Sequence, residues 1–250
     1  MIASPDANSG KINMEHRDSL TERVSNGRVL VFREGREEEK PNGICYAPAT
    51  ISLIASPLPG DRLSNAGQVD YCVVDTGGEI YIGEAIWRHI NNNAGSGMPH
   101  PPEVILTHNH IDHYGGLGGI AHKRRVLAPD SSFVTPDNFT MVPPKLYDEP
   151  GQVIAGSIHS QAPISLNTSR VQALSTPGHS GQDLSVLYTS GDGKVLMCGD
   201  LFWSENDFRN DSEFMGLCVN PEMQKRSRDW VRNTLRPDVI VPGHGPAFAP

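Results

Sequence analysis

The segment "HNHIDH" (108–113) carries three imidazoles and one carboxylate within six residues, and it follows the apolar run "EVILT" (103–107). Neutral imidazole and carboxylate groups are ligands for Zn²⁺, and they also suit iron and manganese. If the apolar run is a strand, the first two histidines lie on one face, because side chains repeat every two residues. A helix after them would point the aspartate and the last histidine at a second position. The segment therefore predicts metal ligands at the end of a strand.

Three other strand ends carry the same residue types. They are "STPGHSGQD" with His179, "MCGDLF" with Asp200 and "VPGHGP" with His244. Strands hold ligands rigidly, and nearby glycines let the backbone approach a central atom. A His-rich surface loop would explain the first cluster alone, but not three further junctions of the same kind. The candidate metal ligands are His108, His110, Asp112, His113, His179, Asp200 and His244.

This ordered set resembles the metallo-β-lactamase superfamily, and "VVDTGG" with Asp75 resembles the first motif of that superfamily. The resemblance covers roughly residues 28–246. It implies an α/β fold, specifically an αββα sandwich in a single domain, with the site at one edge. It also implies that Asp75 supports the metal loop by hydrogen bonds. A plain turn aspartate before the two glycines is the alternative for that residue.

The resemblance also implies a ligand set and a cofactor. Two Zn²⁺ are expected, with Fe or Mn as alternatives. Asp112 is expected to orient the attacking water while it binds the second metal, which makes it the predicted catalytic residue. In the family pattern one metal is bound by His108, His110 and His179, the second is bound by Asp112, His113 and His244, and Asp200 bridges both.

The residue at position 200 separates the branches of the superfamily. The two-zinc β-lactamases have Cys or Ser there, whereas the thioesterase, phosphodiesterase and nuclease branches have Asp. The stretches "STPGHSGQDLSVLY" and "PEMQKRSRDWVRNTLRPDVIVPGHGPAF" resemble one animal branch. That resemblance implies a homodimeric hydrolase of the cytosol and nucleus that cleaves histone pre-mRNA 3′ ends. RNA is therefore the expected substrate. A glyoxalase II-like thioesterase acting on a small thioester and a non-catalytic binding module are the alternatives.

The net charge of −8 argues against binding nucleic acid by bulk electrostatics. Two basic stretches, "HKRR" (122–125) and "KRSRDWVR" (225–232), are either phosphate guides or solvated helix faces. Trp203 and Trp230 are candidate stacking surfaces, although the amphipathic helix around Trp230 favours a core position. The acid that protonates the leaving group is unassigned, and the remaining candidates are His89, His122 and His159.

The hydrophobic pattern predicts a polar, flexible leader over residues 1–27 and one domain over 28–250, which the resemblance implies is metallo-β-lactamase-like. Four scattered cysteines indicate reduced thiols in a reducing compartment. No apolar run is long enough for a membrane span or typical of a signal peptide. Strands are expected at 28–32, 69–78, 103–108, 170–178, 184–190 and 195–202, with one or two strands broken at Pro48 over 44–56 and a last strand and loop over 238–246. Helices are expected at 79–93, 114–123 and 221–235, and loops at 33–43, 57–67 and 129–165.

Overall fold

The structure is a computed structural model of the 250-residue chain. It describes residues 19–25, 27–36, 48–56, 70–93, 101–123, 125–129, 140–141, 170–211 and 214–250. The first 18 residues of the predicted leader, Cys45, His159 and most of the Pro-rich stretch 129–165 lie outside the described residues.

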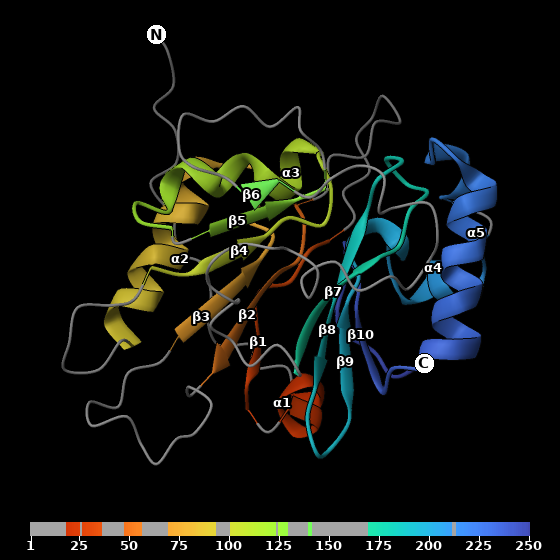
Figure 1. Cartoon of the computed structure of the whole chain (residues 1–250), viewed down its shortest axis with the longest axis horizontal. Coiled ribbons are helices and arrows are strands. Elements are labelled where there is room, and N and C mark those ends of the chain that lie inside the picture. Colours follow the sequence, from red (N-terminus) through yellow and green to blue (C-terminus); the bar gives the residue numbers. More distant parts are fainter. Residues whose placement is uncertain are drawn as a thin grey trace, which may run out of the picture.

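The described strands form two sheets (Figure 1). The first has the order β1 (Val29–Arg33), β2 (Ile51–Ser56), β3 (Asp70–Val74), β4 (Glu103–Ile105), β5 (Arg125–Ala128) and β6 (Thr140–Met141). Its first two pairings are antiparallel, and those from β3 to β6 are parallel. The second has the order β10 (Val239–Val241), β9 (Lys194–Met197), β8 (Leu184–Thr189) and β7 (Val171–Ser175). In this sheet only the β10–β9 pair is parallel.

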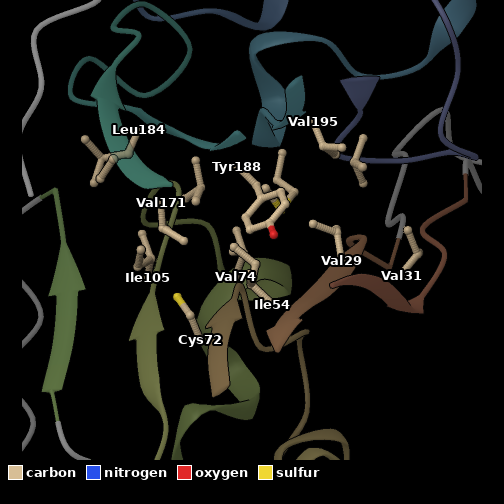
Figure 2. Packing of buried hydrophobic residues seen from close by; sticks show 14 of the residues in the cluster. Val29, Val31, Ile54, Cys72, Val74, Ile105, Val171, Leu184, Tyr188 and Val195 are labelled. Carbon is tan, nitrogen blue, oxygen red and sulfur yellow. The ribbon is translucent and has the colours of Figure 1, made fainter. Parts of the chain in front are cut away.

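The two sheets pack face to face over a common apolar core (Figure 2). Side chains of β3 alternate between two environments, as a strand buried on both faces requires. Cys72 and Val74 face the second sheet, whereas Tyr71 and Val73 pack in the cluster that includes the helix α2. Tyr188 of the second sheet projects into the space between the sheets (Figure 2).

Helices cover both outer faces, which confirms the αββα sandwich (Figure 1). The helix α2 (Ile80–Asn93) buries Ile82, Ile86 and Ile90 against the first sheet, and their spacing of four places them on one face. On the other side, α4 (Glu205–Arg209), α5 (Pro221–Trp230) and the π-helical turn η5 (Val231–Leu235) cover the second sheet. Within the described residues, no helix has the length and apolar character that a membrane crossing requires.

Several elements differ from the sequence prediction. The helix α1 (Ser19–Ser25) falls inside the segment predicted as a flexible leader, and Leu20 and Val24 pack against the core between the sheets. The strand β5 was not predicted, and it begins inside the basic stretch 122–125, so the described part of that stretch is not a helix face. The helix expected over 114–123 is instead the short α3 (Ile111–Tyr114) followed by the 3₁₀ turn η1 (Gly115–Gly119).

Candidate metal centre

The candidate ligands gather where strands of both sheets end. In the first sheet, the parallel strands β3 and β4 end side by side, followed by Asp75 and by the segment 106–113. In the second sheet, β7, β9 and β10 run in the same direction, and each is followed by one ligand candidate: His179, Asp200 and His244. The backbone N–H of Leu184 donates to the carbonyl of Thr107 over 2.8 Å, which joins the two edges.

One group consists of His108, His110, His179 and Asp200. Nδ1 of His110 lies 3.1 Å from Nε2 of His108 and 3.1 Å from Nε2 of His179. Oδ2 of Asp200 lies 3.3 Å from Nε2 of His179 and 3.7 Å from Nε2 of His108. Ligand atoms at tetrahedral angles, each about 2.0–2.1 Å from one ion, lie about 3.4 Å apart. The observed separations therefore suit a single metal ion. His110 alone of this group is exposed, so it marks the open side of the site.

The second group consists of Asp112, His113 and His244. Oδ2 of Asp112 lies 3.5 Å from Nε2 of His244 and 3.7 Å from Nε2 of His113. Oδ1 of Asp200 lies 3.2 Å from Nε2 of His113 and 3.3 Å from Nε2 of His244. The two oxygens of Asp200 thus face different groups, which is the arrangement of a bridging carboxylate.

Three atoms at the centre test whether a metal fits. Among the described residues, Nε2 of His113, Nε2 of His244 and Oδ1 of Asp200 are buried, and although the two nitrogens lie 3.2 and 3.3 Å from this oxygen, none of the three atoms makes a hydrogen bond of suitable geometry. A buried polar atom without a partner is costly, and native structures contain few of them. These atoms converge on one position, and a cation there would satisfy all of them. The residues present therefore fit a bound metal ion, although the identity and number of ions stay predictions.

The electrostatics of the site come from burial and from the interactions of the buried histidines with the neighbouring carboxylates. Burial lowers the pKa of His108 well below its usual range and also lowers that of His110, which favours the neutral imidazole that a metal requires. Burial opposes the charge on Asp200, but His244 and His113 outweigh it and hold the pKa of that carboxyl well below its usual range. Burial likewise opposes charge on His113, but Asp200 and Asp75 hold its pKa well above the usual value.

Two supporting residues fix the loops that carry the ligands. The carboxylate of Asp75 accepts hydrogen bonds from the N–H and the hydroxyl of Thr107, each over 2.8 Å. Asp183 accepts from the N–H groups of Gly178 and Ser180 and from the Ser180 hydroxyl, which closes the turn around His179. The supporting position of Asp75 agrees with the sequence expectation. Asp183 was missed, although an Asp in a Ser-Gly-containing turn is a signal for a side-chain-closed loop.

The other residues that the sequence offered as candidates pack in other parts of the fold. His89 packs against Phe32 and Tyr71, and His122 packs against Trp87, so both belong to the α2 side of the fold. Trp230 packs against the core beside the second sheet, as expected.

One further expectation is wrong, and a second holds only for part of its stretch, where Lys225 and Arg226 are exposed. Trp203 is no open stacking surface, because it is buried between the rings of His244 and Phe214, at centroid distances of 4.1 and 4.7 Å. Arg228 of the second basic stretch is neither a phosphate guide nor solvated, because its side chain is fully buried against Asp207.

The fold agrees with the comparisons. A model of the metallo-β-lactamase superfamily matches residues 69–128, which include the segment 108–113. The chain belongs to this superfamily, whose members are metal-dependent hydrolases.

Within the superfamily, the chain is similar to curated proteins named metallo-β-lactamase domain-containing protein 1. The mouse (Mus musculus) protein is 33% identical over 238 residues, which cover 88% of this chain and 82% of that protein. The Xenopus laevis protein is 29% identical over 222 residues, which cover 88% and 80% of the two chains.

Solved structures show the same fold at low sequence identity. A metallo-β-lactamase-like protein from Thermotoga maritima has a TM-score of 0.57 at 14% identity and covers 89% of this chain and 99% of its own. A quorum-quenching N-acyl homoserine lactone lactonase has a TM-score of 0.52 at 15% identity, with coverage of 87% and 90%.

Proposed function

We propose that this metal-dependent hydrolase is an endoribonuclease that cleaves RNA phosphodiester bonds at two adjacent metal ions, with histone pre-mRNA 3′ ends as its substrate. The observation that supports a two-metal reaction is the position of Asp200, whose Oδ1 and Oδ2 face different histidine groups. Paired metal positions are common in nucleases and phosphatases, where they act on both the attacking and the leaving oxygen. Asp at position 200 agrees with the nuclease branch and equally with the thioesterase branch.

Asp112 and His110 are the residues of this chain that would act on the water and the substrate. Bound metal ions would supply Lewis-acid chemistry, which lowers the pKa of water and polarises a phosphoryl oxygen. Asp112 lies at the second group with its side chain 31% exposed, so its carboxylate borders both the metal position and solvent. It would accept a hydrogen bond from the attacking water and orient it toward phosphorus. The exposed His110 marks the side on which the substrate enters.

A thioesterase acting on a small thioester is the second candidate, and an open surface hollow beside His244 has room for a small substrate. The hollow has a volume of about 590 Å³ and is also lined by Arg36, Ser204, Asn206 and Arg209. This volume falls in the range of pockets for small molecules. The burial of Arg228 removes one cation from an RNA path along α5.

The test is cleavage of a labelled single-stranded RNA that carries a histone-type 3′ end, with lactoylglutathione hydrolysis measured in parallel on the same zinc-loaded protein. Asp112→Asn is the active-site variant. Asp192→Asn removes the same charge from an exposed turn and is the matched control. Site-specific RNA cleavage that Asp112→Asn loses and Asp192→Asn keeps is the expected result.

Other outcomes separate the two candidates. Hydrolysis of the thioester without RNA cleavage would replace the nuclease by the thioesterase. Full RNA cleavage by a metal-loaded Asp112→Asn variant would remove Asp112 from its proposed role. The homodimer and the location in cytosol and nucleus stay predictions from the resemblance. Light scattering of the purified chain would test whether it forms a dimer.

A further inference from the structure

Helix α5 connects the loops that carry His179 and Asp200. The two residues before the helix form backbone hydrogen bonds with the loop that carries His179. Val219 N–H donates to the carbonyl of His179 over 2.8 Å, and Asn220 N–H donates to the carbonyl of Gly178 over 2.9 Å. The Asn220 side chain then caps the helix by accepting from Met223 N–H. The start of α5 is therefore fixed to the His179 loop before the helix begins.

Gln224 contacts both loops. Its side-chain amide nitrogen donates to the backbone carbonyls of Asp200 and Leu201, each over 3.0 Å. Its backbone packs against Gly178, where an added Cβ would lie 2.3 Å from the Gln224 nitrogen. The glycine at 178 is therefore required for this close approach. Gln224 is fully buried, so these contacts are shielded from solvent.

Ser227 adds a second link one turn further along the same helix. Its hydroxyl donates to the carbonyl of Pro177 over 2.7 Å, and its side chain is fully buried. Gln224 and Ser227 are three residues apart, so they share a face of the helix. One rigid helical turn thus holds the loop before His179 and the loop of Asp200 at a fixed separation.

The orientation of the Gln224 amide supports this account. Both of its near neighbours are carbonyl oxygens, so the amide must present its NH₂ group to them. Its oxygen Oε1 has no hydrogen-bond partner among the described residues. A buried amide with an unpaired oxygen is less favourable than an apolar side chain of the same size. Packing alone therefore does not explain a glutamine here, whereas holding two carbonyls does.

We infer that Gln224, together with Ser227, is a positioning residue that sets the distance between His179 and Asp200 and so the geometry of the metal centre. The inference rests on the proposed function, because it assumes that His179 and Asp200 bind metal. Groups that hold ligands in place typically change metal affinity by about 10–100-fold when they are removed.

Three variants test it: Gln224→Met keeps the size but removes the donors, Ser227→Ala removes one hydroxyl, and Gln172→Met makes the same chemical change in β7 as a matched control. Zn²⁺ affinity by chelator competition and the absorption spectrum of the Co²⁺-loaded protein are the measurements. We expect Gln224→Met to lower the Zn²⁺ affinity by about tenfold or more and to alter the Co²⁺ spectrum. Ser227→Ala should change the affinity and the spectrum in the same direction. Gln172→Met should leave the affinity and the spectrum unchanged.

The outcomes separate this inference from the proposed function. Full affinity and an unchanged Co²⁺ spectrum in Gln224→Met and Ser227→Ala would overturn the inference alone, even if both unfold at lower temperature. If Gln224→Met does not fold, the Ser227→Ala result decides in the same way. A wild-type chain that binds no Zn²⁺ would overturn the proposed function and the inference together.

Discussion

Oδ2 of Asp75 lies 2.8 Å from Nδ1 of His113, and this contact ties the end of β3 to α3. Both carboxylate oxygens of Asp75 are engaged, because Oδ1 also accepts from the N–H of Thr107. Asp75 adopts a left-handed backbone conformation with φ of 59°, which is uncommon for a residue with a side chain. With Nδ1 of His113 donating to Asp75, Nε2 is the nitrogen that faces Asp200 and Asp112 and would bind a metal ion.

Asp75→Asn should weaken metal binding at the second group by about 10–100-fold without touching a ligand. The amide keeps the shape of the carboxylate but removes the charge that favours the Nδ1–H form of His113. Calorimetric titration with zinc would measure the loss of metal affinity, and Asp192→Asn is the control for removal of the charge. Equal affinities in the two variants would show that the Asp75 contact is only structural.

Gly243→Ala should disrupt the metal centre although Gly243 carries no ligand. A Cβ at this position would lie 2.0 Å from Oδ1 of Asp200, so the carboxylate must move away from His113 and His244. We expect metal affinity to fall by about tenfold or more. Gly216→Ala is the matched control, because an added Cβ meets nothing within 4 Å there. Unchanged metal binding by Gly243→Ala would mean that Asp200 does not need its present position.

The clustering of the candidate metal ligands could be predicted from sequence because each belongs to a short motif at the end of an apolar strand. The chemistry of "HNHIDH" is local, and the regular strands around it bring the other motifs to the same edge. The supporting residues could not be predicted in this way. Gln224 binds the carbonyl of a residue 24 positions away, and no local pattern of a charged, amphipathic helix indicates that contact.

The pattern of charged residues in 225–232 also did not indicate which side chains are buried. The stretch 225–232 predicts either a solvated face or a phosphate guide, yet Arg228 lies in the interior while Arg226 is exposed. The difference depends on Asp207 in α4, a helix of five residues that is too short to give a periodic signal. Short elements such as α4 and β5 are stabilised by tertiary contacts more than by their own sequence.

Arg228→Ala should destabilise the fold by about 3–5 kcal/mol, because it leaves the buried Asp207 without its cation. The guanidinium donates to both carboxylate oxygens of Asp207 and to the carbonyl of Leu201, and the two side chains are fully buried. Arg226→Ala on the same helix should change the unfolding free energy by about 0.5 kcal/mol or less. Urea unfolding of the metal-free proteins measures both. Similar stability of the two variants would contradict the buried ion pair.

Asp211→Asn should destabilise the metal-free protein at neutral pH and have less effect in acid. Hydrogen bonds from Arg232, and then from Arg228, hold the pKa of Asp211 below its ordinary value. A carboxyl with a lowered pKa in the folded state contributes stability that is fully present above the unfolded pKa of about 3.9 and is lost as the pH falls through the folded pKa. The side chain is 44% exposed, so solvent screening limits the contribution to about 1 kcal/mol or less. Urea unfolding at pH 7 and pH 3 should show the difference from wild type narrowing in acid, while Asp192→Asn stays close to wild type at both. A difference that is equal at the two pH values would exclude an ionised Asp211 as its source.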